Sequence, residues 1–310
     1  MALRTFLKPL LLAATLATAG NALADAPAGA PPVPLLWKVS DADNAVYLLG
    51  SFHLLKPSDY PLSQDAEAAF ADAKAVVFEV DPADLTSPET LAKFQRAAGY
   101  QDGKTLSQVL PADVKQKLEQ VLAVSGGSLA QVEGSEPWAI TMGMMIGMAQ
   151  AAGFRQEQGM DMHFIRRAAE AGKPVSGLET IDDQIAALDG APHDEQAYSL
   201  GELLKNPQES VTELLKLHTM WRAGDAGGLD GEFRHKMKAE IPVSYRLVNT
   251  ERNEAWVPRI AQRLEQPGGD NTLFVVGALH LLGEDGVVEK LRARGYAVER
   301  ICSACAKGGE

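Results

Sequence analysis

Two histidines stand in the same short phrase near opposite ends of the chain. The phrases Gly50-Ser51-Phe52-His53 and Gly277-Ala278-Leu279-His280 share the pattern Gly-x-x-His, and two leucines follow each histidine. Neutral imidazole is the commonest protein metal ligand, and glycine lets the backbone approach a bound group closely. A histidine that merely caps a loop is the ordinary alternative. Packing alone does not call for the same phrase twice, so the pair is predicted to hold an ion between distant parts of the chain.

A carboxylate completes the candidate set. Glu79 lies near the end of the apolar run 75–80, where a buried carboxylate is costly unless it is paired or bound to a metal. If the strand of Glu79 pairs with the strand before His53, both side chains reach the same edge of the sheet. With His280, this gives two imidazoles and one carboxylate, a set that suits manganese, cobalt or zinc with a position left for water. Such an ion would lower the pKa of that water and polarise a carbonyl group.

The elements that must position these residues are strands at the two ends of the chain. Apolar runs at 45–49 and 272–276 precede the two histidine phrases, and both predict buried strands that open into loops, the edge at which open α/β sheets bind ligands. Further strands are predicted at 37–40, 75–81, 174–177 and 296–301. The middle of the chain has mostly helical patterns. The predicted fold class is therefore α+β (mixed α/β), with a small central sheet built from the N- and C-terminal segments and a large helical insertion between them.

The first residues have the pattern of a cleavable signal peptide. Two basic residues, an apolar stretch and the small-residue phrase Ala22-Leu23-Ala24 predict a leader over 1–24, cut after Ala24. The apolar part is shorter than the roughly 20 residues of a membrane span. We therefore expect a periplasmic or secreted protein with no stable membrane span after cleavage. Residues 25–35, rich in Ala and Pro, predict a flexible segment at the entrance to a single domain over 36–305, with the helical insertion at about 111–265.

The charge of the chain limits its partners. The sequence has 29 basic and 41 acidic residues and a formal net charge of −12, which becomes −14 once Arg4 and Lys8 leave with the leader. Phosphate binding depends on clustered Lys and Arg, so we expect no nucleic acid partner. A peptide or small-molecule substrate remains, and the oligomeric state stays open. The two cysteines, Cys302 and Cys305, predict a local disulfide in an exported chain.

A methionine-rich stretch at 142–148 allows two interpretations. Thioether side chains are ligands for Cu(I), but methionine also fills gaps in helical cores. Residues 139–152 are apolar nearly all round the helix. The stretch is therefore predicted to be a buried helix.

The chain also resembles a known family, the TraB/PrgY/GumN family, which is related to the TIKI membrane metallopeptidases and more remotely to the erythromycin-esterase and ChaN-like folds. The resemblance spans nearly the whole chain after the leader and follows the order of the family's motifs. The matching phrases are Gly50 to His53, Phe78-Glu79-Val80-Asp81, Gln158-Gly159-Met160-Asp161, Leu178-Glu179-Thr180, Glu251-Arg252-Asn253 and Gly277 to Gly283 with Gly286.

The resemblance implies that His53, Glu79 and His280 occupy the positions proposed to carry metal-dependent hydrolysis in the TIKI branch. Arg252 and Asn253 would then point a guanidinium and an amide toward the same pocket and stabilise an oxyanion.

Other readings of the supporting residues stay open. Arg252 could instead form a salt bridge with Glu251 or Glu254, although neighbours one or two apart on a helix do not face each other. Asp161 and Glu179 could supply further acid groups, and Asp161 also fits the N-cap of a helix.

The leading hypothesis is a periplasmic metal-dependent hydrolase acting on peptide bonds, in which Glu79 is the third metal ligand or the general base. The chain lacks a His-Glu-x-x-His phrase, so the peptidase assignment rests on the resemblance. One alternative is a non-catalytic protein that binds a peptide or a metal, as the pheromone-shutdown members of the family are thought to do. Another is a metal-free esterase with His53 as its base.

Overall fold

The protein combines one mixed sheet with many helices, which confirms the predicted fold class. The computed structural model describes residues 29–85, 87–266 and 268–305, so the predicted signal peptide lies outside the described residues. Within them, six strands form one sheet in the order β4-β3-β5-β2-β1-β6. The strands are β1 (Leu36–Ser40), β2 (Ala45–Ser51), β3 (Ala75–Val80), β4 (Val175–Glu179), β5 (Thr272–Gly277) and β6 (Ala297–Arg300).

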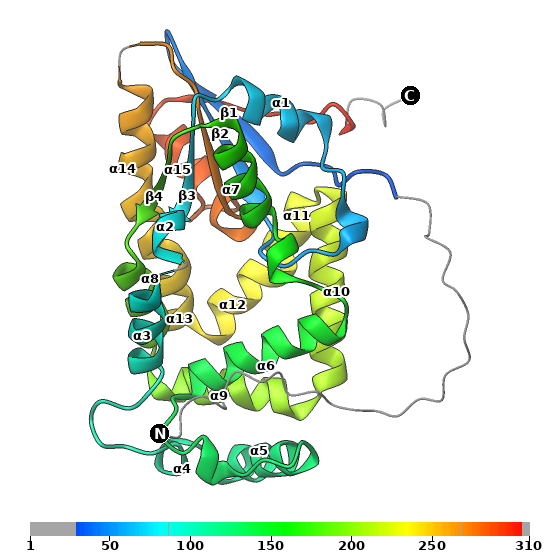
Figure 1. The fold of residues 1–310 in the computed structure, drawn as a ribbon, viewed down its shortest axis with the longest axis vertical. Coiled ribbons are helices and arrows are strands. Elements are labelled where there is room, and N and C mark those ends of the chain that lie inside the picture. Colours follow the sequence, from blue (N-terminus) through cyan, green and yellow to red (C-terminus); the bar gives the residue numbers. More distant parts are fainter. Residues whose placement is uncertain (1–28, 86, 267, 306–310) are drawn as a thin grey trace.

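Helices connect and cover these strands (Figure 1). The α-helices are α1 (Gln64–Asp72), α2 (Pro82–Leu85), α3 (Pro88–Ala97), α4 (Leu106–Val109), α5 (Ala112–Val124), α6 (Pro137–Ala151), α7 (Met160–Ala171), α8 (Ile181–Asp189), α9 (His193–Lys205), α10 (Pro207–Ala223), α11 (Ala226–Gly228), α12 (His235–Glu240), α13 (Pro242–Tyr245), α14 (Arg252–Leu264) and α15 (Val287–Ala293). Short 3-10 turns are η1 (Pro57–Asp59), η2 (Leu129–Gln131), η3 (Gln156–Gln158) and η6 (Ala278–Leu281), and π-helical turns are η4 (Leu229–Arg234) and η5 (Arg246–Glu251).

The order of the strands corrects one expectation about the sheet. The strand of Glu79, β3, does not pair with β2; β5 lies between them and is parallel to both. β4 is parallel to β3 at one edge, so a strand from the middle of the chain joins those from its ends. Four parallel strands therefore direct their carboxyl ends to the same edge, the usual place for a ligand in such a sheet.

The main core lies on the two faces of this sheet. β5 is buried along its whole length, as its six apolar or small residues predict for a central strand covered on both sides. Helix α14 contributes buried Trp256, Val257, Ile260 and Leu264 to this core, while α1 and α7 contribute Phe70 and Phe164. Burial of these large side chains fixes the strand ends in place, because each is worth roughly 1.5–3 kcal/mol.

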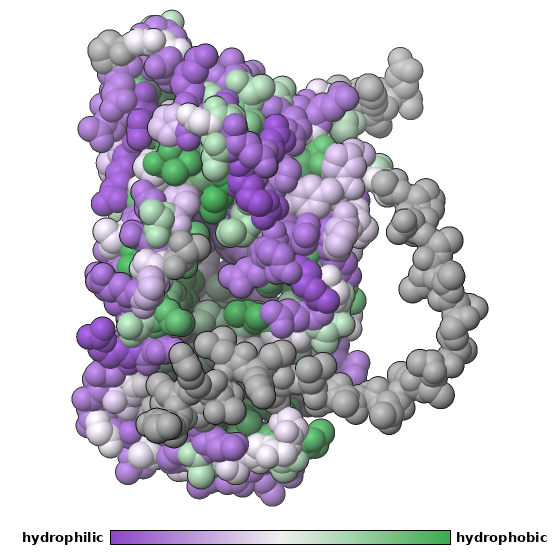
Figure 2. All heavy atoms as spheres, viewed as in Figure 1, coloured by the Kyte–Doolittle hydropathy of each residue, from purple (hydrophilic) through white to green (hydrophobic). Residues whose placement is uncertain are grey.

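A second, separate core holds the lower helices of Figure 1 together. Buried leucines of α4, α5 and α9 form it, and Ile140 and Met144 of α6 pack against it. The molecule thus has a layer built on the sheet above and a helical layer below, with α10, α12 and α13 running between them in Figure 1. Figure 2 shows that the surface is hollowed between the two layers.

Two further expectations can be compared with the structure. Cys302 and Cys305 form a disulfide, as predicted. The expectation for α6 was wrong in part, since this helix is not buried all round: Met145 is 54% exposed, and Met142 and Ile146 are partly exposed. The physical reason is that α6 packs on the second core through Ile140 and Met144, whereas Met145 lies outside that core. None of the helices in the described part of the chain is long and apolar enough to cross a membrane.

Candidate functional site

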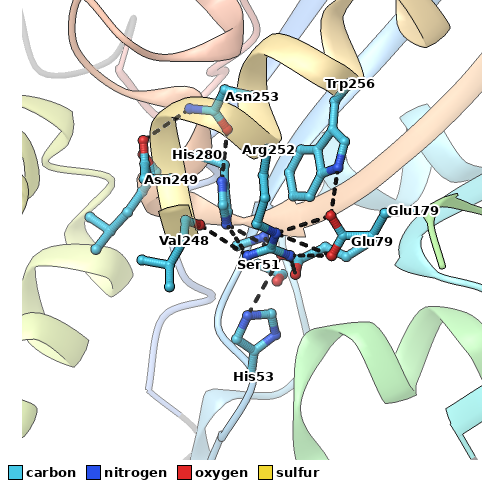
Figure 3. A network of polar contacts seen from close by, with 12 residues as sticks. Ser51, His53, Glu79, Glu179, Val248, Asn249, Arg252, Asn253, Trp256 and His280 are labelled. Atoms are coloured by element: carbon cyan, nitrogen blue, oxygen red, sulfur yellow. Dashed lines mark hydrogen bonds and ion pairs between the residues drawn. The ribbon is translucent and has the colours of Figure 1, made fainter. Parts of the chain in front are cut away.

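Four strand ends bring the candidate residues together (Figure 3). β2 ends at Ser51, two residues before His53, and β5 ends at Gly277, three residues before His280 in η6. β3 places Glu79 next to its last residue, and β4 ends on Glu179. Helix α14 approaches the same edge from the side with Arg252 at its first position. The predicted residues from both ends of the chain therefore share one site.

Asp161 holds His53 in a fixed orientation. The Nδ1 of His53 is 2.8 Å from Oδ2 of Asp161, while the hydroxyl of Ser51 donates to the other oxygen of that carboxylate at 2.9 Å. The Nε2 of His53 therefore faces Glu79 and lies 3.8 Å from its Oε1. Asp161 raises the pKa of His53 to about 9, because the nearby carboxylate outweighs the opposing effect of burial. The side chain is nevertheless 59% exposed, so a ligand in solvent can reach it.

Helix α7 brings Asp161 to His53 through a close backbone contact. Gly159 is the N-cap of this helix, and Asp161 lies in its first turn, so the N-cap reading of Asp161 was wrong. A Cβ at Gly159 would stand 2.1 Å from the carbonyl oxygen of His53, which leaves no room for any side chain. The amide of Met160 donates to the carbonyl of Phe52 at 3.1 Å. These contacts explain why the Gln-Gly-Met-Asp phrase accompanies the first histidine phrase.

Asn253 orients His280 in a similar way. The Nδ1 of buried His280 is 2.7 Å from Oδ1 of Asn253, which leaves its Nε2 as an acceptor 4.0 Å from Oε1 of Glu79. Burial and then the charge of Arg252 lower the pKa of His280 to about 3, so this ring is neutral at ordinary pH. The ring also packs on Trp256, with 4.5 Å between centroids.

The amide nitrogen of Asn253 does not point into the site. It donates to Oδ1 of Asn249 at 3.0 Å and to the carbonyl of Asp285 at 2.9 Å, and the residue is fully buried. Both amide hydrogens are therefore engaged away from the pocket. This arrangement differs from the expected oxyanion contact and makes Asn253 a positioning residue for His280.

Arg252 is the cation at the centre of the site. Its Nη2 donates to Oε2 of Glu79 and to Oε1 of Glu179, each at 2.7 Å, and its Nη1 lies 3.2 Å from Nε2 of His280. The alternative pairing with its sequence neighbours is wrong, because Glu251 pairs with Arg246 and Glu254 with Lys290. The π-helical turn η5 precedes Arg252, and such turns often mark functional sites.

The two carboxylates around Arg252 titrate in opposite directions. Burial would raise the pKa of Glu79, but Arg252, the two histidines and the Gly277 amide, 2.7 Å from Oε1, hold it well below its usual range. Burial raises the pKa of Glu179 above its ordinary value, against the effect of Arg252. The indole of Trp256 donates to Oε2 of Glu179 at 2.9 Å. Glu79, whose pKa is held low, is a potential ligand or base.

Gly277 leaves space between the three predicted metal ligands. A Cβ on this residue would lie 3.2 Å from both Oε1 of Glu79 and Nε2 of His53, and 3.4 Å from Cδ2 of His280. This absence of a side chain also explains how Glu79 faces His53 across the intervening strand. The Nε2 atoms of His53 and His280 lie 3.8 Å and 4.0 Å from Oε1 of Glu79, somewhat farther than the roughly 3.4 Å between two ligand atoms of a tetrahedral ion, so small side-chain movements would bring them into range.

The donor set therefore fits a divalent ion in its chemistry and orientation. Metal-bound histidines usually have their second nitrogen held by an oxygen, as Asp161 and Asn253 do here. In the present conformation, however, the described residues include no group of three or more His, Cys, Asp or Glu side chains placed to ligate one ion. The guanidinium of Arg252 instead binds Glu79 and lies against His280.

A second buried ionic cluster, formed by Asp59, His218 and Arg222, lies next to the first histidine phrase and was not predicted from the sequence. His218 is 8% exposed, and its Nε2 is 2.9 Å from Oδ2 of Asp59. Arg222 pairs with the same carboxylate. On the same helix, α10, the indole of Trp221 donates to the carbonyl of Gly50 at 3.0 Å. No local pattern marks such a pair, because its partners lie 159 residues apart.

The chain is similar in sequence to several known proteins. The chain is 25% identical over 246 residues to the uncharacterized protein YbaP of Escherichia coli, covering 79% of this chain and 87% of YbaP. It is 22% identical over 307 residues to Metalloprotease TIKI2 of Danio rerio and 23% identical over 316 residues to Metalloprotease TIKI1 of Homo sapiens. These matches cover 82% and 85% of this chain but only 58% and 61% of the two TIKI proteins. The sequence profile of the TraB/PrgY/gumN family matches residues 35–300. The chain therefore belongs to the TraB/PrgY/gumN family.

Proposed function

We propose that this protein is an exported metal-dependent hydrolase that cleaves peptide bonds. One observation carries the proposal. The histidines of the two Gly-x-x-His phrases direct Nε2 toward the same oxygen of Glu79, at 3.8 Å and 4.0 Å, while an oxygen holds the other nitrogen of each ring. That orientation is typical of histidines that bind metal. The names of the TIKI relatives, both metalloproteases, support the same reaction class.

His53, His280 and Glu79 would hold the ion, with manganese, cobalt and zinc as the candidates. A divalent ion supplies a Lewis acid for a carbonyl and lowers the pKa of a water. Glu79 is ionised well below neutral pH, so it can serve either as a ligand or as the base that takes a proton from that water.

Arg252 offers a fixed positive charge to the reacting carbonyl. Glu179 binds its Nε and Nη2 at 2.7–3.1 Å, which holds the guanidinium plane in place before a substrate arrives. The five N–H groups of Arg252 are engaged by Glu79, Glu179, His280 and the carbonyl of Val248, so Arg252 would stabilise the negative oxygen that develops during attack through its positive charge. The disulfide near the C-terminus supports export, because such bonds persist in oxidising compartments.

Metal content of the purified protein tests this proposal first. Elemental mass spectrometry should find close to one manganese, cobalt or zinc per chain, and His53→Ala with His280→Ala should remove it. His235→Ala is the matched control, since its side chain is 58% exposed and pairs only at 3.8 Å with Asp230. A chain that stays metal-free after all three ions are supplied would contradict the metal-dependent mechanism.

A metal-free hydrolase is the second candidate, and one contact favours it. Arg252 lies 3.2 Å from the nitrogen of His280 that a metal would need, so the guanidinium can serve as the cation of the site itself. His53, paired with Asp161, would then act as the base once it loses its proton, so this activity should rise with pH toward about 9. Ester and peptide cleavage measured with and without a chelator separates the two, because only the metal-dependent enzyme loses activity. A protein that only binds peptide would keep its affinity in Glu79→Gln and show no turnover in the unaltered chain.

A further inference from the structure

Arg234 is a buried cation that the proposed mechanism does not use. Its side chain is 1% exposed and comes from the π-helical turn η4. Its Nε donates to Asp230, and its Nη1 lies 2.9 Å from the hydroxyl of Tyr245 and 3.4 Å from Oδ2 of Asp285. The same hydroxyl donates to Oδ2 of Asp285 at 3.2 Å. A buried charge is costly unless it is paired and hydrogen-bonded, so these three partners hold Arg234 in one place.

The guanidinium of Arg234 lies against the loop that follows His280. A Cβ at Gly283 would stand 2.3–2.4 Å from Nε, Cζ and Nη2 of Arg234, and the φ of this glycine is +70°, so the position admits no side chain. The amide of Gly286 donates to the carbonyl of Gly283 at 3.0 Å, and a Cβ there would lie 2.4 Å from the carbonyl oxygen of Leu282. The two glycines therefore let the loop close tightly over Arg234.

This loop fixes the direction of the amide that holds His280 (Figure 3). The carbonyl oxygen of Asp285 can only accept, so the atom of Asn253 that lies 2.9 Å from it is the amide nitrogen. The carbonyl of Leu279 orients Asn249 in the same way at 3.3 Å, and Oδ1 of Asn249 accepts from Asn253 at 3.0 Å. Oδ1 of Asn253 must then face Nδ1 of His280, so that nitrogen carries the proton. The Nε2 of His280 is left with the lone pair.

We propose that Arg234 is a positioning residue for His280. By holding the loop in place, it keeps the carbonyl of Asp285 at the amide of Asn253, and thereby keeps the Nε2 lone pair of His280 directed into the site. The inference rests on the proposed function for the use of that lone pair, although the hydrogen bond between Asn253 and His280 requires no ion. Because Arg252 also contacts Nε2, the proton on Nδ1 is the group to measure.

Heteronuclear NMR of imidazole N–H groups in the chelator-treated protein tests the inference. The unaltered protein should show a slowly exchanging Nδ1 proton of His280, identified by its loss in His280→Ala. Arg234→Lys keeps the charge, but one ammonium group cannot contact all three partners, so exchange of this proton should become about tenfold faster. Tyr245→Phe, which keeps the ring in the core, should change exchange in the same direction. Zinc affinity in a separate titration should fall about 10- to 100-fold in Arg234→Lys.

Val114→Ala is the matched control. Val114 is buried in the separate second core, so its truncation lowers stability without touching the loop after His280. It should lower the urea midpoint and leave both the exchange of the His280 proton and the zinc affinity unchanged.

Three results would overturn the inference. They are equal acceleration of exchange in Val114→Ala, unchanged exchange in both Arg234→Lys and Tyr245→Phe, and the lack of a protected Nδ1 proton of His280 in the unaltered protein. Failure of the proposed function is distinguishable from these results. A chain that binds no ion would refute the metal-dependent hydrolase, while exchange of the His280 proton would still report on the role of Arg234.

Discussion

Gly277→Ala is the most specific test of the candidate metal site. Its backbone φ of −52° and ψ of 134° are open to alanine, and the amide that donates to Glu79 is kept. The only change is therefore a methyl group between the three predicted ligands. Because the contacts of the main chain are unaltered, any effect reports on the space that these side chains share.

The size of the effect follows from the distances. The methyl would stand 3.2 Å from Oε1 of Glu79 and Nε2 of His53, a few tenths of an ångström inside an ordinary contact. The side chain of His53 is exposed and can swing outward. The free energy of unfolding should therefore fall by at most about 1–3 kcal/mol, which is the usual cost of an extra methyl group in a packed core. Metal bonds tolerate only about 0.2 Å, however, and a displaced ligand should weaken metal binding about 10- to 100-fold.

Isothermal titration with manganese, cobalt and zinc measures this loss, and urea unfolding measures the stability. Gly134→Ala is the control, since no atom lies within 4 Å of its Cβ position, and it should leave metal affinity unchanged. Undiminished metal affinity in Gly277→Ala, with the fold intact, would refute the reasoning, because an ion could not then lie between these three side chains.

Three further predictions concern charge and covalent structure. A metal ion must displace the proton of His53, whose pKa is about 9, so metal affinity should rise with pH until about 9. In Asp161→Asn the pKa of His53 should fall toward its ordinary value, because the neighbouring negative charge is lost. Titrations at several pH values should then show metal affinity levelling off at a lower pH than in the unaltered protein. Arg252→Gln leaves two buried carboxylates without their cation and should lower the free energy of urea unfolding by about 3–5 kcal/mol, whereas an unchanged midpoint would contradict the contacts described. Reducing the Cys302–Cys305 disulfide should hardly change the melting temperature, because the closed loop is short, Cys305 is exposed and Cys302 is only partly buried; a large drop in calorimetry would contradict this expectation.

Local signals in the sequence predicted the strands and marked the candidate residues that the structure brings together. Apolar runs ending in glycine located β2 and β5, and the repeated histidine phrase singled out two residues 227 positions apart. Glu79 was recognisable because a carboxylate within an apolar strand needs a partner. Each of these inferences used only neighbouring residues.

The remaining features depend on contacts that leave no local pattern. The place of β5 between β2 and β3 is set by pairing across some 200 residues. Arg252 and Asn253 were assigned to one pocket, although successive residues on a helix point in directions about 100° apart. The structure accordingly turns Arg252 toward the carboxylates and Asn253 toward His280. For α6, composition alone could not reveal which positions of an apolar helix pack on the second core and which, like Met145, stay exposed.

The central place of β5 also determines when the site can form. A growing chain makes β2 and β3 early, but the strand that lies between them starts only at Thr272. Until then, the two strands have no native partner in common, and His53 and Glu79 lack the glycine and the second histidine that complete their site. Contacts of such long range make folding slow and cooperative. A truncated chain that ends before β5 would therefore lose the sheet and the site together, which ties any metal-dependent activity to completion of the whole chain.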